Sequence, residues 1–105
     1  MKRFENKVCL VTGGTSGIGY EIAKRLAEEG GIVIVCSVDS NLEEAAASLS
    51  KGTDHKVVAL PCDVTVAAQR QQVLHYIQTT HNRIDVLALN AGILGYRGTQ
   101  LKQSE

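Results

Sequence analysis

The chain has 105 residues, 44% of them hydrophobic, which is enough for one small core and at most one domain. Its 11 basic and 11 acidic residues balance, so no net charge favours nucleic acid or an anionic membrane as a partner. The N-terminal segment is polar, and no apolar run approaches the roughly 18 residues of a membrane span. We therefore expect a cytoplasmic protein that binds neither nucleic acid nor membranes.

The cysteines and histidines give no sign of a metal or disulfide site. Cys9, Cys36 and Cys62 lie in or beside apolar segments and form no C-x-x-C pair, which predicts reduced side chains in the core. The spacing of the histidines does not suit a metal, so we expect these residues on the surface: His55, His75 and His81.

Short apolar runs alternate with segments of helical periodicity along the chain. Strands are predicted at Lys7–Thr12, Ile32–Cys36, Val57–Leu60 and Ile84–Asn90. The first helix should run from Ile18 to the Gly30-Gly31 pair, with Glu29 on its solvent face. The second should begin at a capping box, Ser40 to Glu43, and end near Leu49, and Thr65 should cap the third. The apolar faces are expected to use Ile18, Ile22, Ala23, Leu26 and Ala27 in the first helix, and Val66, Val73, Leu74 and Ile77 in the third.

This β-α-β-α-β-α-β order predicts an α/β fold, a three-layer, partial Rossmann-type unit with helices on both faces of a parallel sheet. Right-handed crossovers give the strand order 3-2-1-4. We assign residues 1–92 to this domain and residues 93–105 to a loop or tail. The fourth strand is then an apolar edge, near Leu87 and Leu89, through which the chain is expected to self-associate.

The loop Thr12–Gly19, a G-x-x-x-G-x-G between a strand and a helix, is the main candidate site. Gly13 suits a tight turn, Gly17 a close approach of backbone to a pyrophosphate, and Gly19 close packing of helix on sheet. The N–H groups that begin the helix favour an anion. The cofactor contacts expected here are Gly13, Thr15, Ser16, Gly17, Ile18 and Gly19.

A P-loop and a simple turn are the alternatives for such a glycine cluster. A P-loop requires Lys-Ser/Thr after its last glycine, and the chain has Tyr20-Glu21 there, which argues against an NTPase. The position of the cluster between strand and helix argues against a simple turn.

Two further segments lie at the expected carboxyl edge of the sheet. Asn90-Ala91-Gly92 follows the fourth strand, next to the glycine loop, where α/β sheets bind ligands. Asp63-Val64 follows the third strand, where the carboxylate can accept a hydrogen bond from an adenine amino group, with Val64 against the ring. Asp63 is equally suited to the cap region of the third helix, and the sequence leaves both roles open.

These three motifs, in this order and spacing, resemble the classical short-chain dehydrogenase/reductase family from Phe4 to about Gly92. One departure is Leu89, where the family usually has a second asparagine. The resemblance implies NAD or NADP as cofactor and hydride transfer at an alcohol or carbonyl. It also implies a catalytic serine, a Y-x-x-x-K pair and a further asparagine, all from segments later than this sequence covers. The literal Y-x-x-x-K from Tyr20 to Lys24 lies on the first helix, and we expect no catalytic role for it.

The choice between NAD and NADP is made just after the second strand. Ser37, Val38 and Asp39 stand there, and no basic residue occupies position 15, 16 or 38, where NADP-preferring relatives would carry one. Asp39 lies where the general dinucleotide fingerprint has an acid, whereas the family's acid often falls at Ser37. The balance favours NAD.

The sequence thus predicts the NAD(P)-binding part of a short-chain oxidoreductase, inactive on its own. The alternative is a non-catalytic product or pseudoenzyme that binds nucleotide or pairs with a longer relative. A third hypothesis is a structural domain that binds no ligand. Failure to bind a reduced nicotinamide cofactor would favour it.

Overall fold

Four apolar segments form strands, and the segments between them form helices, as predicted. The computed structural model describes residues 3–15 and 17–89. The strands within them are β1 (Val8–Thr12), β2 (Ile32–Ser37), β3 (Val58–Pro61) and β4 (Val86–Leu89). The helices are α1 (Gly17–Glu28), α2 (Leu42–Leu49) and α3 (Ala67–Thr80).

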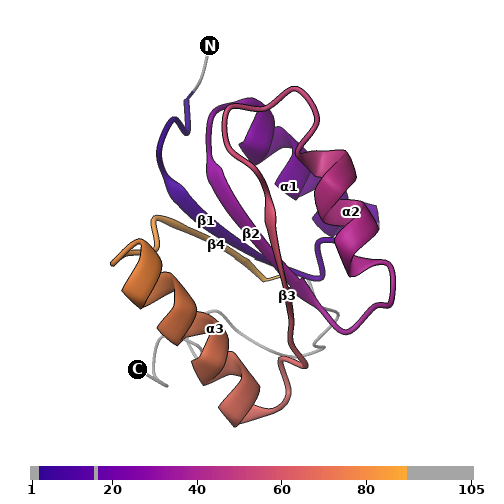
Figure 1. Ribbon diagram of the computed structural model, residues 1–105, viewed down its shortest axis with the longest axis vertical. Helices are drawn as coiled ribbons and strands as arrows, with labels where there is room; N and C mark the ends of the chain where they lie inside the picture. The colour runs from indigo at the N-terminus through magenta and orange to yellow at the C-terminus, as the bar shows by residue number, and fades with distance from the viewer. Residues whose placement is uncertain (1–2, 16, 90–105) are drawn as a thin grey trace.

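All neighbouring strands pair in parallel, in the order β3-β2-β1-β4, which confirms the predicted order 3-2-1-4. In register, Cys9 of β1 lies opposite Val33 of β2 and Val86 of β4. Helices α1 and α2 cover one face of the sheet and α3 covers the other (Figure 1). The molecule is therefore the expected three-layer unit, with β1 between its two neighbours.

Side chains that alternate along β1 and β2 form two hydrophobic cores, one on each face of the sheet. Those that face α1 and α2 are Cys9, Val11, Val33 and Val35. Those that face α3 are Val8, Leu10, Ile34 and Cys36. The helices contribute Ala23, Leu26 and Ala27 from α1, and Val73 and Ile77 from α3. Most of the predicted helix faces are confirmed.

Three residues predicted for the helix cores are exposed instead. Ile18 is 71% exposed, Leu74 40% and Val66 38%. Ile18 and Val66 lie at the beginnings of their helices, beyond the part that packs on the sheet. Leu74 lies beside the buried Val73 and lines an open cavity between α3 and β4.

The predicted helix caps are also wrong. The capping box from Ser40 to Glu43 is not formed, because α2 takes Asn41 as its N-cap residue, without a side-chain hydrogen bond. Helix α3 has Val66 as its N-cap residue, likewise without one. Thr65 instead donates its hydroxyl and its backbone N–H to Asp63 Oδ1, at 2.6 and 3.0 Å. The Thr65 hydroxyl therefore bonds the Asp63 carboxylate and does not cap the helix.

Glu29, predicted on the solvent face of the first helix, is buried just after α1. Arg3 donates to both of its carboxylate oxygens, at 2.7 and 3.0 Å, and Arg25 Nε donates to Oε2 at 2.7 Å. Hydrogen bonds from Arg3 and then from Arg25 lower the Glu29 pKa to about 2. This network holds the N-terminal segment against the end of α1.

Asp85 joins the beginning of β4 to the beginning of β1. Its Oδ2 accepts from the Val8 N–H and from Arg83 Nε, both at 2.8 Å. These bonds, the Val8 one first, lower the Asp85 pKa. The Asp85 N–H also donates to the Val8 carbonyl at 2.8 Å, so the two strands begin in register.

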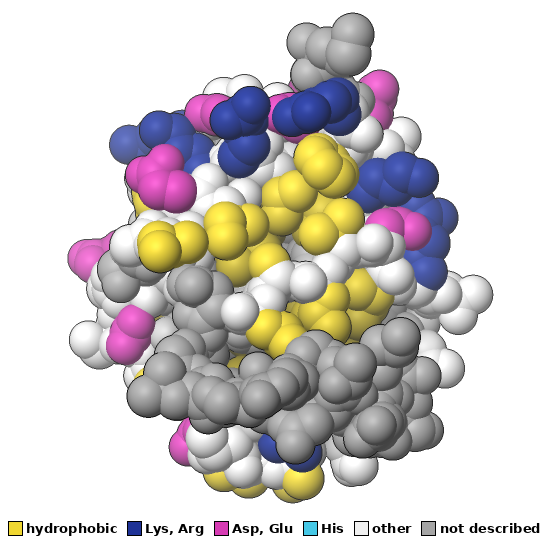
Figure 2. All heavy atoms as spheres, turned by 180° about the vertical axis from the view of Figure 1, so that it is seen from behind, with side chains coloured by type: hydrophobic (Ala, Val, Ile, Leu, Met, Phe, Trp, Pro, Cys, Tyr) yellow, Lys and Arg dark blue, Asp and Glu magenta, His cyan; other side chains and the backbone are white. Residues whose placement is uncertain are grey.

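Strand β4 is the open edge of the described sheet, since β1 is its one paired neighbour there. Leu87 is 40% exposed, and Val86, Ala88 and Leu89 are half-buried. Seen from behind, hydrophobic side chains gather on the side of the molecule where β4 runs, with basic side chains beyond them (Figure 2). The predicted apolar edge is therefore present in the fold.

The cysteine prediction is confirmed, because Cys9, Cys36 and Cys62 are all buried free thiols. Burial is the main reason why the pKa of Cys36 rises to about 12 and that of Cys9 to about 11. Within the described ranges, no cluster of three His, Cys, Asp or Glu side chains is arranged to hold a metal. No helix there is long and apolar enough to cross a membrane.

Candidate functional site

The glycine loop turns sharply off β1 and leads directly into α1. Gly13 has φ 66° and Gly17 has φ 59°, a left-handed conformation that residues with a Cβ rarely adopt. The Gly13 N–H donates to the Cys36 carbonyl at 2.8 Å. The loop therefore bends over the carboxyl end of β2, and the first turn of α1 begins at Gly17.

Gly14 lies flat against β2, a contact that the sequence did not reveal. A Cβ at this position would lie 2.8 Å from Val35 Cγ1 and 3.1 Å from Val35 Cβ, which is too close for a real contact. Val35 is fully buried, so it has little room to move. The glycine is required here because the loop backbone packs directly on a core side chain.

Thr15 and Asp39, predicted separately as cofactor contacts, meet across the mouth of the loop. The buried Thr15 hydroxyl donates to Asp39 Oδ2. The Asp39 backbone N–H donates to Ser37 Oγ at 3.0 Å, and Ser37 is itself buried at the end of β2. Val38, between them, is 70% exposed. The structure thus brings the glycine loop and the segment after β2 into direct contact.

Asp63 lies in a turn after β3 and makes two backbone hydrogen bonds in addition to those between its side chain and Thr65. Its carbonyl accepts from the Val66 N–H at 2.9 Å, and its own N–H donates to Gln69 Oε1 at 2.7 Å. The two Thr65 bonds, hydroxyl first, lower the Asp63 pKa. Asp63 thus lies in the turn before α3 without capping the helix through its side chain, and its half-buried carboxylate stays partly accessible at the carboxyl edge of the sheet.

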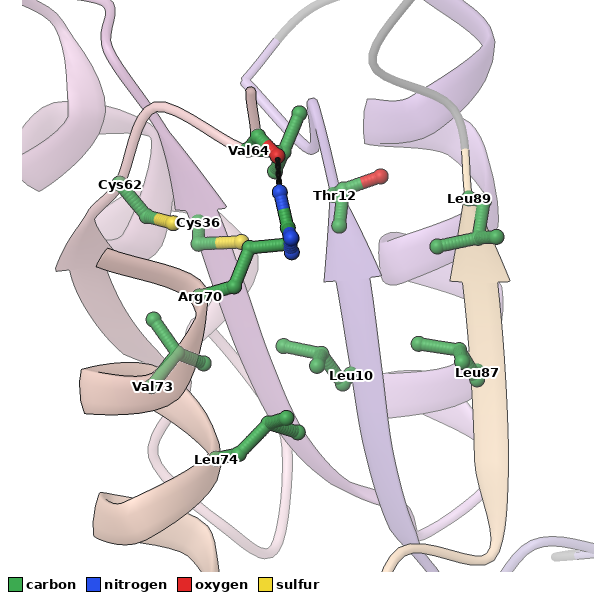
Figure 3. Close-up of a pocket in the computed structure, with 10 residues that line it drawn as sticks. All are labelled: Leu10, Thr12, Cys36, Cys62, Val64, Arg70, Val73, Leu74, Leu87 and Leu89. Atoms are coloured by element: carbon green, nitrogen blue, oxygen red, sulfur yellow. Dashed lines mark hydrogen bonds between the residues drawn. The ribbon is translucent and has the colours of Figure 1, made fainter. Parts of the chain in front are cut away.

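Val64 lines an apolar cavity between α3 and the sheet (Figure 3). Arg70 Nη1 donates to the Val64 carbonyl at 2.7 Å and fixes this segment to α3. Leu10, Leu87 and Leu89 line the opposite side of the cavity. The side chains of Cys36 and Cys62 lie next to each other at one end of the cavity (Figure 3).

The remaining predicted contacts divide into two groups. Ile18 and Gly19 lie in the first turn of α1, where Ile18 is exposed beside the loop and Gly19 is buried. The others lie outside the described residues: Ser16, Asn90, Ala91 and Gly92.

The Tyr20 and Lys24 pair has the surroundings expected of surface residues. The Tyr20 hydroxyl lies 2.7 Å from Ser48 Oγ and joins α1 to α2. Lys24 is exposed on α1. The tyrosine hydroxyl is therefore used in a contact between two helices.

A glycine loop that follows the first strand of a 3-2-1-4 parallel sheet and opens a helix defines a nucleotide-binding unit of the Rossmann type. The family model for short chain dehydrogenase matches residues 7–105. The chain belongs to the short-chain dehydrogenase family.

Individual relatives agree with this assignment. The chain is 42% identical over 87 residues to the uncharacterized oxidoreductase YxjF of Bacillus subtilis, which covers 83% of this chain and 34% of the relative. It is 38% identical over 101 residues to dehydrogenase/reductase SDR family member 4 of Mus musculus, with 95% and 36% covered. The chain thus spans about a third of the length of these relatives.

Solved structures show the same fold. A short chain dehydrogenase from Mycobacterium smegmatis matches with a TM-score of 0.81 and 28% identity, over 98% of this chain and 46% of that one. The L-sorbose reductase of Gluconobacter frateurii, solved with NADPH and L-sorbose, also has a TM-score of 0.81 at 28% identity, over 95% and 41%. The chain therefore shares its fold with less than half of each of these structures.

Proposed function

We propose that this chain is the cofactor-binding part of a short-chain oxidoreductase and holds the adenosine half of a nicotinamide dinucleotide. The observation that carries the proposal is the Gly13–Gly17 turn, which opens α1 at the carboxyl edge of β1. Backbone N–H groups at a helix start bind phosphate well, because they are unpaired and lie at the positive end of the helix dipole. Residues 1–92 would form this unit and residues 93–105 a tail.

The residues present fit such a ligand. Among the described residues, no atom apart from its chain neighbours and its own helix backbone lies within 4 Å of the position of a Cβ at Gly17, which leaves room for a pyrophosphate there. Thr15 and Asp39 supply a hydroxyl and a carboxylate where the adenine-side ribose would lie. The bound dinucleotide would supply hydride exchange with an alcohol or carbonyl substrate. This chain would bind and orient it, and later segments would carry the acid–base chemistry, so the chain alone should show no turnover.

Two glycine variants test the binding site against a matched control. Gly17 and Gly52 both have positive φ, 59° and 73°, and both have open space at the Cβ position. Gly17→Ala and Gly52→Ala should therefore lose similar stability, about 1–2 kcal/mol. Only Gly17→Ala places a methyl group in the proposed pyrophosphate site, so only this variant should lose NADH affinity, about tenfold or more. Titration calorimetry gives the affinities, and equal affinities for the two variants would refute the site.

We further propose that the site prefers NAD to NADP. An acidic residue at the ribose favours the 2′-hydroxyl, and positions 15 and 38 carry Thr and Val instead of a base. Val38→Arg should raise NADP affinity by about tenfold, through one charge-assisted hydrogen bond to the 2′-phosphate. No gain for NADP would show that this segment does not contact the ribose.

The open β4 edge favours a second proposal, in which the isolated chain self-associates or pairs with a longer relative. Leu87→Lys places a charge on this edge and should shift sedimentation toward the monomer. Val66→Lys, at a similarly exposed apolar residue before α3, is the control and should leave association unchanged. A wild-type chain that is monomeric at high concentration would contradict this proposal.

A further inference from the structure

We propose that Thr15 determines how the site discriminates at the ribose, by positioning the Asp39 carboxylate at the mouth of the glycine loop. The inference rests on the proposed dinucleotide binding and adds a role for a residue of the phosphate loop itself. Thr15 is a positioning residue in this scheme, because it acts on the ligand through Asp39.

The position of Thr15 follows from the packing of the loop on β2. The Gly13 N–H donates to the Cys36 carbonyl, and Gly14 leaves no room for a Cβ against Val35. These contacts place the next residue of the loop beside the end of β2. Thr15 is buried there, and its β-branched side chain has few rotamers, so its hydroxyl has a well-defined direction.

Asp39 depends on that hydroxyl for its orientation. The residue is exposed, and an exposed aspartate normally samples several rotamers. The Thr15 hydroxyl donates to Oδ2, while the Asp39 N–H is held by Ser37 Oγ at 3.0 Å. These two hydrogen bonds fix both the backbone and the side chain of Asp39. Its carboxylate therefore faces the loop, although Asp39 lies two residues after the end of β2.

A carboxylate in this position interacts differently with the adenosine ribose of NAD and with the 2′-phosphorylated ribose of NADP. It has about four acceptor positions and Thr15 uses one, so a ribose 2′-hydroxyl can still donate to it. A 2′-phosphate in the same place would meet a like charge and has no proton to donate. If the Thr15 hydroxyl is removed, the carboxylate is free to rotate into solvent, and both effects weaken together.

The test compares, by titration calorimetry, two ligands that differ only at the 2′ position: ADP and 2′-phospho-ADP, which is ADP with a phosphate on its ribose 2′ oxygen. Thr15→Val keeps the shape of the side chain and removes the hydroxyl, and Thr15→Ser restores it. We expect Thr15→Val to reduce the preference for ADP by about tenfold, the value of one charge-assisted hydrogen bond. Thr15→Ser should keep the wild-type preference. Thr79→Val is the control, because it removes a hydroxyl that bonds the His75 carbonyl on α3 at 3.0 Å, and it should change nothing.

The outcomes separate this inference from the proposed function. If Thr15→Val weakens both ligands by the same factor, Thr15 contacts the phosphates directly and the inference is wrong. An unchanged preference in Thr15→Val also overturns it, provided that circular dichroism shows a folded chain. If the wild-type chain binds neither of these ligands nor NADH, the proposed function itself fails, and the inference with it.

Discussion

Replacing Gly14 with alanine probes the contact that holds the glycine loop on the sheet. The new methyl carbon would lie 2.8 Å from Val35 Cγ1 and 3.1 Å from Val35 Cβ. Val35 is fully buried and β-branched, so neither a rotamer change nor a small shift makes room at low cost. Overpacking of this kind typically costs about 1–3 kcal/mol in the free energy of unfolding.

The companion variant Val35→Ala removes Cγ1, the atom that would lie nearest the new methyl carbon, and leaves the Cβ at 3.1 Å. Alone, this variant should lower the free energy of unfolding by about 2 kcal/mol, because two buried methyl groups are lost and a cavity remains. In the double variant the alanine at position 14 fills part of that cavity. The two changes together should therefore cost less than their sum, by about 1 kcal/mol or more.

Urea unfolding followed by circular dichroism gives the four free energies of this cycle. Gly52→Ala supplies the control, since it also replaces a loop glycine but lies far from Val35 and has open space around it. Its effect should add to that of Val35→Ala within about 0.5 kcal/mol. Strict additivity of Gly14→Ala with Val35→Ala, or a neutral Gly14→Ala, would refute the reasoning.

Three further predictions concern side chains away from the loop. Because the Glu29 pKa falls from 4.5 to about 2 on folding, its ion pairs should stabilise the chain fully above 4.5 and lose this effect as pH falls toward 2. Glu29→Gln should lower the urea midpoint near neutral pH and flatten its acid dependence; an unchanged profile would contradict the network. The Asp85 pKa is lowered from its ordinary value of 3.8, so its hydrogen bonds should stabilise the chain above pH 3.8 and lose this effect at lower pH. Asp85→Ala should therefore lower the urea midpoint near neutral pH. Glu28→Ala, on the exposed side of α1, is the control and should leave that midpoint unchanged. The three thiols should resist Ellman's reagent in the native state near neutral pH and react after unfolding in urea, because burial raises the pKa of each; rapid labelling of the native chain would argue against the core.

The element order and sheet topology follow from features that are local in the sequence. An apolar run such as Ile32–Ser37 is buried on both faces, and its alternation with helical segments favours a parallel sheet with helices on each side. Right-handed crossovers then leave few ways to order the strands. Both steps are governed by general sterics, so periodicity and composition were sufficient for the fold.

The helix ends were less predictable because each depends on competition among neighbouring groups. Thr65 is a good capping residue by type, but the carboxylate of Asp63, two residues earlier, takes its hydroxyl. Glu29 has the spacing of a solvent-facing residue, yet Arg3 folds back across 26 residues to bind it. Such partners are settled by the tertiary structure, and helical periodicity does not reveal them.

The same distinction applies to the candidate site. The positive φ of Gly13 and Gly17 could be predicted, since a strand-to-helix turn of this length requires it. The contact of Gly14 with Val35 could not, because it joins residues on two different elements. The hydrogen bond from Thr15 to Asp39 could not be predicted either, because it joins the loop to the segment after β2. In the sequence, Asp39 lies where the general dinucleotide fingerprint has an acid, although the family's acid often falls two residues earlier, at Ser37. Thr15 follows the glycine that packs on β2 and lies within hydrogen-bond distance of the carboxylate, and that glycine had no predicted role.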